Sequence, residues 1–502
     1  MSASSEVVTA QSIVSPELIC RLTLPAHRKL MEISSSSPAT MNLLDSASFS
    51  GISVGYEYDH QQQALMQQLG DGAQRFSIDA QSFSHLSEAT TVWGTAGFST
   101  GSMRNVRWSN CIDFERVAPY VLGDGTGGDL STRTYTFSGG YNRRFDRWTL
   151  GVDAAYRAEI AYRNRDPRVK TVVSDLDIDL GGSYRFTDRY VAGVNTGINV
   201  YNQNSDLEFY NPVNDINTYP LTGLGTYYKR FTGNTTKSTG HQSLGLSVGV
   251  QLIPVNGEGF AADILFDHYR MNERLRNYNN LTLAYTDNNL MTANLLYLSS
   301  LSSLLKIAPS LSLTSRSRKG TENLFGTSSA MSYDVIGTRS NYRHSSLIGR
   351  LQIPVELHLA AGYFTVTPAA TFDHTSEKII DIDRRLSVSH LTPELNLDFS
   401  AITSRRLLWR AGLSAAYSCT SAPEKDNNIL RQAPSIEPDQ LSSCVVENYD
   451  MLIADHLGLG ANINVTKQIN RIIYGIELSY NYFHYSGHGS RNSLAVTLSA
   501  TF

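Results

Sequence analysis

The chain has 502 residues, a formal net charge of -4 and a pI of about 6.3, so it lacks the basic surface expected of a nucleic-acid-binding protein. Hydrophobic residues make up 41% of the chain, which is slightly low, whereas the number of tyrosines, 27, is high. This combination is typical of a wall that has lipid on one face and water on the other. The sequence contains no run of about 18 apolar residues, so no transmembrane helix is expected.

Residues 1–47 show no clear alternation of apolar and polar side chains. Their start, MSASSEVVTAQSIV, has no basic residues and no long apolar core, so we do not expect a secretory signal there. We treat 1–47 as one unit and 48–502 as a second. The first unit is either a lead or an insert into the structure that the second unit forms.

From residue 48 onward, apolar and polar residues alternate with the period of two that defines a strand. In WTLGVDAAYR, for example, Trp148, Leu150 and Val152 share one face, and Gly151 and Asp153 share the other. The pattern predicts eighteen strands, near 49–59, 74–83, 88–98, 131–143, 147–160, 172–186, 190–202, 240–253, 258–270, 280–299, 303–316, 343–353, 357–376, 385–400, 406–419, 451–466, 471–485 and 491–502.

The connections alternate between short turns, such as NRRFD and KQINR, and long polar loops. The long loops are expected near 60–73, 99–130, 161–171, 203–239, 317–342 and 420–450. This wiring is typical of outer-membrane barrels, and a soluble sandwich gives no reason for it. We therefore predict an all-β, antiparallel transmembrane barrel in the bacterial outer membrane, with eighteen strands or, as the alternative, sixteen. The long loops would be extracellular and both termini periplasmic, which makes 1–47 a periplasmic lead or a lumen insert.

The chain ends in an alternating strand, SRNSLAVTLSATF. In a closed barrel the last strand pairs with the first, because an open edge in lipid would leave backbone groups unsatisfied. The ending also resembles the insertion signal of outer-membrane proteins, which makes the barrel-assembly machinery an expected partner. The signal positions are Leu494, Val496, Leu498, Ala500 and Phe502.

Several residues are candidates for chemistry in the lumen or at the rim. The inward face is expected to carry mostly acidic charges, at Asp153, Asp177, Asp179, Asp263, Glu394, Asp398, Arg410 and Glu477. The acids of DLDIDLGG fit a lumen-facing row better than a calcium loop, because the Gly and Glu of an EF-hand are absent. The glycine-rich LGDGTGGDL precedes a strand, which favours a surface or inward-folded loop over a phosphate site.

Four Asp-His dipeptides, at residues 59–60, 267–268, 373–374 and 455–456, fall towards the predicted external rim. Some outer-membrane hydrolases place Asp and His there to activate water, but neighbours in a strand point to opposite faces. We therefore expect no enzyme, no cofactor and no metal site, with a rim protease or phospholipase as the alternative. Cys419 and Cys444 flank the loop 420–443, so a disulfide is expected in an oxidising compartment, with two free thiols as the alternative.

Three stretches resemble an uncharacterised outer-membrane β-barrel family of Bacteroidota. They are SFSGISVGYEYD, WSNCIDFERVAPYVLGDGTGGDLSTRTYTFSGGY and WTLGVDAAYRAEIAYRNRDPR. The family has no established activity, but its setting implies work beside TonB-dependent receptors and surface lipoproteins. The expected function is therefore that of an accessory subunit of a nutrient-uptake complex or of a solute channel. A plugged structural or adhesion barrel is a further alternative.

Overall fold

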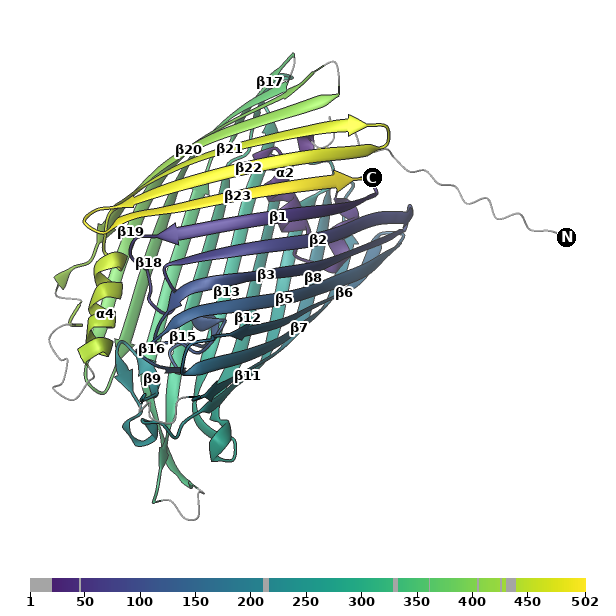
Figure 1. Cartoon of the computed structure of the whole chain (residues 1–502). Coiled ribbons are helices and arrows are strands. Elements are labelled where there is room, and N and C mark those ends of the chain that lie inside the picture. Colours follow the sequence, from purple (N-terminus) through teal and green to yellow (C-terminus); the bar gives the residue numbers. More distant parts are fainter. Residues whose placement is uncertain are drawn as a thin grey trace.

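The computed structural model describes residues 20–44, 47–210, 216–327, 333–360, 362–403, 406–424, 427–429 and 439–502. Strands dominate, and most of them form one antiparallel sheet that closes on itself (Figure 1), beside a small sheet of β4 (Val121–Gly123), β9 (Tyr219–Gly223) and β10 (Thr226–Tyr227). Within the described ranges, no helix is both long and apolar enough to cross a membrane.

The wall strands follow one another in chain order around the barrel. They are β1 (Phe49–Gln61), β2 (Gly72–Ser87), β3 (Thr90–Val106), β5 (Gly128–Phe145), β6 (Trp148–Tyr162), β7 (Arg168–Arg185), β8 (Tyr190–Glu208), β11 (Ser238–Pro254), β12 (Gly259–Leu275), β13 (Leu281–Ser300), β14 (Leu305–Ile307), β15 (Ser310–Phe325), β16 (Val335–Gln352), β17 (Val355–Leu359), β18 (Gly362–Ile379), β19 (Arg384–Ile402), β20 (Leu407–Ser421), β21 (His456–Ile469), β22 (Ile472–Tyr485) and β23 (Gly489–Thr501).

These twenty segments make eighteen strands, because two strands are each interrupted by a proline. Pro309 separates β14 from β15, and Pro354 separates β16 from β17. Proline cannot donate a hydrogen bond to the neighbouring strand, so it interrupts the ladder. Both halves of each strand stay in the sheet, since β14 pairs with β17 and β15 with β16. The predicted number of eighteen strands is confirmed.

The barrel closes between the first and last strands, which lie side by side in Figure 1. Residues from Gly51 to Gln61 pair with residues from Thr501 back to Arg491. Beyond this register, the Ser50 amide donates to the Phe502 carbonyl at 2.9 Å, and the Phe502 amide donates to the Ser50 carbonyl at 2.8 Å. The chain therefore ends in a paired strand, and neither β1 nor β23 presents an open edge to lipid.

The outer face of the wall is apolar. On β11, for example, Leu244, Leu246 and Val248 are each 56–61% exposed, while the intervening Ser247 faces the interior. Trp148 and Trp409 are also exposed on the outer face, each close to a short turn. Aromatic residues at this level are typical of the interface between lipid and water. Alternation places the five insertion-signal positions on the same outer face.

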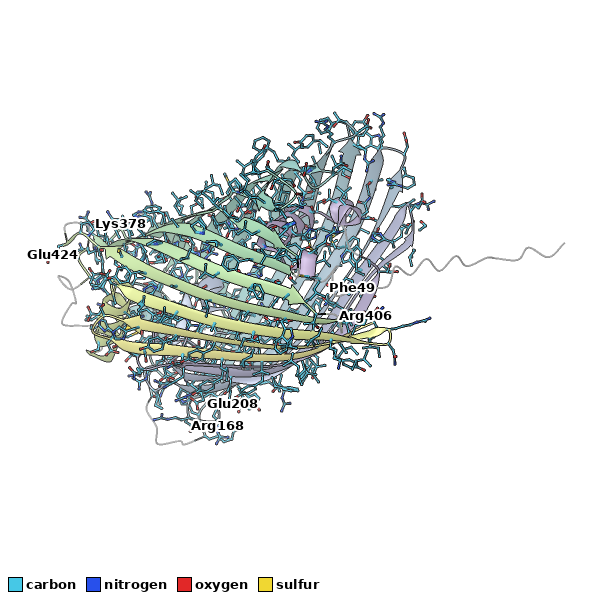
Figure 2. All side chains as sticks on the ribbon, turned by 90° about the horizontal axis from the view of Figure 1, so that it is seen from above. Phe49, Arg168, Glu208, Lys378, Arg406 and Glu424 are labelled. Atoms are coloured by element: carbon cyan, nitrogen blue, oxygen red, sulfur yellow. The ribbon has the colours of Figure 1, made fainter. Side chains whose placement is uncertain are left out.

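The two ends of the barrel differ, and Figure 2 labels Phe49 and Arg406 near one end and Lys378 and Glu424 near the other. The short-turn end carries tight connections such as 146–147 and 186–189. The long-loop end carries the connections 62–71, 107–127, 209–237 and 422–455. The last of these contains helix α4 (Asp439–Leu452), so the prediction of a strand beginning at residue 451 was wrong by about five residues.

Five of the six predicted long loops are shorter than predicted. β3 extends to Val106 and β5 begins at Gly128, while β15 and β16 reach Phe325 and Val335. The connections 276–280 and 380–383 are also short, so turns and loops do not alternate strictly. The reason is that strand pairing continues beyond the bilayer, where both faces can be polar and the apolar alternation no longer marks the strand.

We expect an arginine on the lipid face to destabilise the barrel far more than one on the lumen face. Val496→Arg should lower the free energy of unfolding by about 2–4 kcal/mol, the cost of a cation near the bilayer centre. Thr497→Arg, which adds the same residue on the opposite face, should cost little. Urea unfolding in lipid vesicles measures both. Equal losses would contradict the assignment of the two faces.

Candidate functional site

The described part of the N-terminal unit, residues 20–44, lies inside the barrel near the short-turn end (Figure 1). We call it the N-terminal lumen segment. It comprises helix α2 (Pro25–Ser34) and the 3-10 helix η1 (Pro38–Leu43). Helix α2 packs against β11, β12 and β13, and η1 packs against β5, β6, β7 and β8. Of the two expectations for this unit, the structure places these residues as a lumen insert.

Two glycines make room for η1 on the wall. A Cβ atom at Gly151 would lie 2.5 Å from the carbonyl carbon and oxygen of Pro38, and one at Gly181 would lie 2.5 Å from Ser37 Oγ. Gly151 and Gly181 face each other across β6 and β7. We call this pair the glycine cradle. Any side chain at either position would displace η1 from the wall.

Polar side chains beside the cradle bind the backbone of η1. Asn142 Nδ2 donates to the Pro38 carbonyl at 2.9 Å, and Ser183 Oγ donates to the Ala39 carbonyl at 3.0 Å. Thr40 Oγ1 donates to Gln251 Oε1 at 3.0 Å. The first two bonds satisfy backbone carbonyls that would otherwise be buried without partners, so the wall is complementary to this particular segment.

Helix α2 combines an apolar face with charged anchors. Ala26 and Ile33 pack against wall residues that include Ile253, Ala261 and Leu296. Lys29 Nζ donates to Asn294 Oδ1 at 2.8 Å and is ion-paired with Glu32 at 2.8 Å. The Ala26 amide donates to Glu356 Oε1 at 3.3 Å. The apolar contacts and the anchors together fix the helix against the β11–β13 side of the lumen.

A second segment folds into the lumen from the long-loop end. Residues 107–127, which we call the lumen loop, include the short helix α3 (Phe114–Val117) and strand β4 (Val121–Gly123). Trp108, Cys111 and Val117 are buried in a cluster with wall residues Val173 and Tyr201. This cluster also includes Leu221 of β9 (Tyr219–Gly223) and Leu441 of α4. The lumen loop, β9 and α4 therefore share one apolar core.

Asp113 is the central anchor of the lumen loop. Its carboxylate accepts two hydrogen bonds from Arg157, at 2.6 and 3.1 Å, and one from the Tyr201 hydroxyl at 2.8 Å. Next to it, Arg116 donates to Asp175 at 2.9 Å and to Asn199 at 2.6 Å. Strands β6, β7 and β8 thus hold the loop through a connected network of charge-assisted bonds, which are stronger than neutral ones.

Arg318 on β15 binds the far end of α3. Its guanidinium donates to the carbonyl oxygens of Glu115 at 2.9 Å and Arg116 at 3.2 Å, and also to that of Ala118. A cation at a helix C-terminus satisfies carbonyls that have no partner within the helix. His241 Nε2 bonds the carbonyl of Tyr120 at 2.8 Å. The lumen loop is therefore fastened from β6 around to β15.

The glycine-rich stretch 122–130 closes the lumen loop and returns the chain to the wall. Asp124 is ion-paired with Arg163 at 2.6 Å, and both side chains are almost fully buried. The other Asp124 oxygen accepts hydrogen bonds from the amides of Thr126 and Gly127. Strand β5 follows directly. The stretch is an inward-folded turn, one of the two interpretations that its sequence favoured.

A chamber of about 380 Å³ lies between the two lumen segments. Ser35 and Ser36 border it on one side, and Arg116 borders it on the other. Four carboxylates of the wall line it: Asp153, Asp177, Asp179 and Asp267. A second space of about 530 Å³ lies beside α2, lined by residues including Arg28, Arg350, Asn396 and Asp398. The lumen is thus partly filled, and the remaining spaces have polar linings, mainly acidic in the chamber and of mixed charge beside α2.

The structure places all eight predicted lumen charges on the inner face. Asp153, Asp177 and Asp179 line the chamber, and Asp263 accepts a bond from Asn294 at 3.3 Å. Glu394 forms a two-bond pair with Arg350 at 2.6 and 2.7 Å. Asp398 and Arg410 lie within electrostatic reach of Arg28, and Glu477 accepts a bond from Asn464 at 3.1 Å. The charges therefore belong to several sites along the lumen rather than to one.

The Asp-His dipeptides do not form a catalytic cluster. Asp59 is ion-paired inside the barrel with Arg491 at 2.8 Å, and Asp267 faces the chamber. His268 and His374 bond neighbouring polar residues on the outer face, Asn289 at 2.9 Å and Ser389 at 2.9 Å. The dipeptides come from β1, β12, β18 and the start of β21, which are not adjacent. In the described ranges, no three His, Cys, Asp or Glu residues are arranged to hold a metal ion.

The expected disulfide between Cys419 and Cys444 is not present, because both of these cysteines are free thiols. Cys419 is exposed on the outer face of β20, whereas Cys444 on α4 is buried in the core of the long-loop end. The two residues lie on opposite sides of the wall, so no bond can join them. Burial, followed by the nearby Glu447, raises the pKa of Cys444 to about 12.

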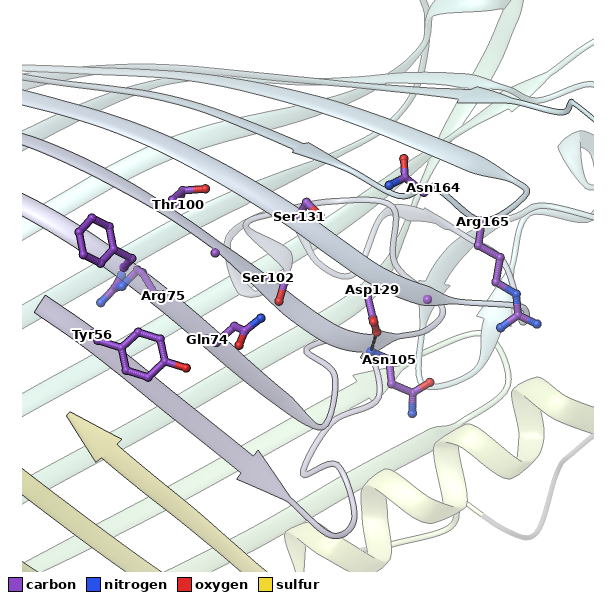
Figure 3. A pocket seen from close by; sticks show the side chains of 13 residues that line it. Tyr56, Gln74, Arg75, Thr100, Ser102, Asn105, Asp129, Ser131, Asn164 and Arg165 are labelled. Atoms are coloured by element: carbon purple, nitrogen blue, oxygen red, sulfur yellow. Dashed lines mark hydrogen bonds between the residues drawn. The ribbon is translucent and has the colours of Figure 1, made fainter. Parts of the chain in front are cut away.

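A hollow of about 960 Å³ lies at the long-loop rim (Figure 3). Tyr56 and Phe76 at one end of it are exposed side chains of the outer face. Gln74, Ser102 and Arg165 are among the polar residues that line the rest. The hollow is therefore outside the lumen, at the level where the outer face of β2, β3 and β5 changes from apolar to polar.

The sequence alone did not reveal the residues that hold the two lumen segments. Neither the glycine cradle nor the anchors Asp113 and Arg318 were singled out. One signal was available, since WSNCIDFERVAPYVLG is unusually rich in apolar and aromatic residues for a solvent-exposed loop. The inward positions of Gly151 and Gly181 were also readable from the alternation, but their partner η1 was not.

The closed sheet, its apolar outer face and its polar lumen together define an integral outer-membrane β-barrel with an occupied lumen. The chain belongs to a family of unknown function, DUF6850, whose model matches residues 38–502. That match begins at the first residue of η1, so the part that fills the glycine cradle falls within the family unit. No curated protein matches the chain.

The solved structures that resemble the chain are outer-membrane proteins with little sequence identity to it. The ferric preacinetobactin receptor BauA from Acinetobacter baumannii is 9% identical, with 91% of this chain and 80% of that chain covered and a TM-score of 0.39. The copper transporter OprC is 9% identical, with the same coverage and a TM-score of 0.42. The outer membrane transporter YddB from Escherichia coli is 8% identical, with 90% and 80% covered and a TM-score of 0.41.

We expect Arg318 to control how firmly the lumen loop is held. Arg318→Met removes the charged hydrogen bonds to α3, each of which contributes roughly 1.5–3 kcal/mol. Trypsin should then cut the loop after Arg107 or Arg116 in the folded barrel, and the native loop should resist. Arg316→Met is the control, because Arg316 lies on the same face of β15 two residues earlier. Equal cleavage of both variants would contradict the anchoring role.

We expect one cysteine to react in the folded protein. A membrane-permeant maleimide should modify exposed Cys419, and leave Cys20, Cys111 and Cys444 unmodified because they are buried. Burial also favours the unreactive protonated thiol. Mass spectrometry of the labelled protein without reduction measures this. Recovery of a peptide pair joined through Cys419 and Cys444 would contradict the arrangement.

Proposed function

We propose that the protein is a gated conduit that passes or captures polar, preferentially cationic solutes at the cell surface. The observation that carries the proposal is the acidic chamber between two lumen segments, each of which is held by polar contacts together with an apolar cluster. Neither segment takes part in the strand pairing that closes the wall. The segments can therefore be displaced without unfolding the wall.

The inner wall next to the segments supports the same proposal. On the β1–β3 and β23 side, a space of about 230 Å³ is lined by small polar residues and glycines, including Ser53, Thr95, Gly97 and Ser499. Asp79 and Gln81 in this lining are exposed to the lumen. A purely structural barrel has no need for a hydrated inner surface of small side chains, whereas a solute path does.

We further propose that the long-loop end is extracellular and that both termini are periplasmic. The anchored core of loops would then guard the outer entrance, and the N-terminal lumen segment would guard the inner one. The role of an accessory subunit beside TonB-dependent receptors and surface lipoproteins rests on the family resemblance. Co-purification from native membranes would test this part of the proposal separately from conduction.

A role as a rim hydrolase is the competing candidate, and the geometry favours the conduit. A hydrolase needs a His oriented by a carboxylate and close to a nucleophile or water. His268 and His374 instead bond an asparagine and a serine on the outer face. Purified protein should therefore leave casein and phospholipid intact.

The glycine cradle provides a direct test of gating. Gly181→Val should expel η1, because its Cβ would lie 2.5 Å from Ser37 Oγ, and should raise the conductance of the barrel in a planar bilayer. Gly182→Val is the matched control on the same strand. Its Cβ would lie on the outer face, 3.7 Å from Leu150 Cδ2, which is an ordinary contact. Unchanged conductance in a correctly folded Gly181→Val variant would contradict the gate.

The charge of the chamber should determine which ions pass. The opened barrel should prefer cations, because a low-dielectric wall concentrates the field of like charges. Adding Asp177→Asn and Asp179→Asn to Gly181→Val should weaken this preference, which reversal potentials in a salt gradient measure. An anion preference in the opened barrel would contradict the role of the acidic chamber.

A further inference from the structure

Four basic side chains form a row on the outer face at the long-loop end. Lys319 on β15 lies opposite Arg343 on β16, which lies opposite Lys378 on β18, which in turn lies opposite Arg385 on β19. Figure 2 labels Lys378 at this end of the barrel. Their neighbours Arg318, Tyr342 and Arg384 are buried on the inner side, so alternation places the four basic residues outside. We call them the basic row.

A row of four serines runs directly below the basic row on the same strands. Ser317, Ser345, Ser376 and Ser387 are paired with one another across β15, β16, β18 and β19 in the same way. The apolar face lies two outward positions beyond the serines on each strand, at Leu313, Gly349, Phe372 and Leu391. At about 3.3 Å per residue, the basic row lies roughly 20 Å along the strands from this apolar level. With the usual tilt of barrel strands, that is the level of lipid head groups.

The basic row is incompletely neutralised by the protein. Asp383 is shared by Lys378 at 2.9 Å and Arg385 at 3.2 Å. Asp287 lies opposite Lys319, but its ion pair at 2.7 Å is with Arg270. No carboxylate of the described residues is ion-paired with Lys319 or Arg343. Like charges directly opposite each other destabilise a sheet, so the row is costly unless an external anion covers it.

We propose that the basic row and the serines below it bind the phosphorylated saccharide head group of a lipid in the leaflet at the long-loop end. Phosphate is the anion that lysine and arginine bind together, and arginine adds paired hydrogen bonds. The serine hydroxyls can donate to phosphate oxygens and can both donate to and accept from sugar hydroxyls.

The size of the row indicates the kind of head group. Three strand-to-strand steps of about 4.8 Å make it roughly 14 Å wide, which is wide enough for a head group carrying two phosphates and wider than a single one needs. A free phosphate ion would contact only one or two of the basic side chains. The orientation also matters, since a lipid embedded in the belt would present its head group to the row from below, across the serines.

Binding of bisphosphorylated lipid A to the full-length protein in detergent micelles tests the proposal, with native mass spectrometry as the readout. Each basic side chain near an anionic surface contributes about fivefold to binding. Lys319→Gln with Arg343→Gln should therefore weaken lipid A binding by roughly 30-fold. Dephosphorylated lipid A should bind the native protein weakly, and phosphatidylglycerol, with one phosphate, should bind less tightly than lipid A.

The matched control is Arg133→Gln with Lys170→Gln. These two residues are also basic and exposed on the outer face, and the double change alters the net charge equally. They lie on β5 and β7, separated by β6, so they do not form a row. Binding should fall less than about twofold in this control. Equal losses in both double variants, or equal binding of dephosphorylated lipid A, would overturn the proposal.

Two further measurements separate the site from general effects. Without lipid, Lys319→Gln with Arg343→Gln should raise the unfolding temperature, because it removes like-charge repulsion. A lower unfolding temperature would show that the row stabilises the wall itself and would overturn the argument from unpaired charge. Inorganic pyrophosphate at millimolar concentration should not displace lipid A; complete displacement would show that the site takes free phosphates.

Discussion

The whole molecule depends on the need to satisfy every backbone polar group of a chain that lies in lipid. An antiparallel sheet meets this need only if its edges meet, and the pairing of β1 with β23 down to Phe502 achieves it. Closure forces each strand to present one face to lipid and the other to an enclosed lumen. A wall of eighteen strands encloses more space than its own side chains can fill, so the contents of the lumen become a separate problem that the chain solves with its own segments.

The two lumen segments are held by different kinds of interaction. The N-terminal lumen segment combines an apolar helix face with a backbone fitted against Gly151 and Gly181. The lumen loop depends on charge networks centred on Asp113 and Arg318, together with an apolar core shared with α4. Buried charge networks are strong when complete and costly when one partner is lost. The binding of the first segment to the wall thus depends mainly on shape, and that of the second depends mainly on charge.

The fold could be derived from the sequence because alternation is a local property that each strand carries by itself. The eighteen strands, the inward position of residues such as Asp177 and the outward position of Trp148 all followed from it. Strand ends did not, since β3 and β15 continue as polar ladders beyond the apolar belt. The pairing of Cys419 with Cys444 was wrong because a loop length says nothing about which side of the wall a helix such as α4 occupies. The lumen contacts were not derivable, because Arg318 and Ala118 are 200 residues apart in the chain.

The glycine cradle also imposes an order on assembly. The segment that it receives is made first, but Gly151 and Gly181 of the receiving surface, on β6 and β7, emerge from the ribosome more than a hundred residues later. Residues 38–43 must therefore wait, without their final partners, until these strands have paired. Leu43 in this segment and Ile33 before it lack their apolar partners in the wall during that time, so this part of the chain would need a chaperone before the wall exists.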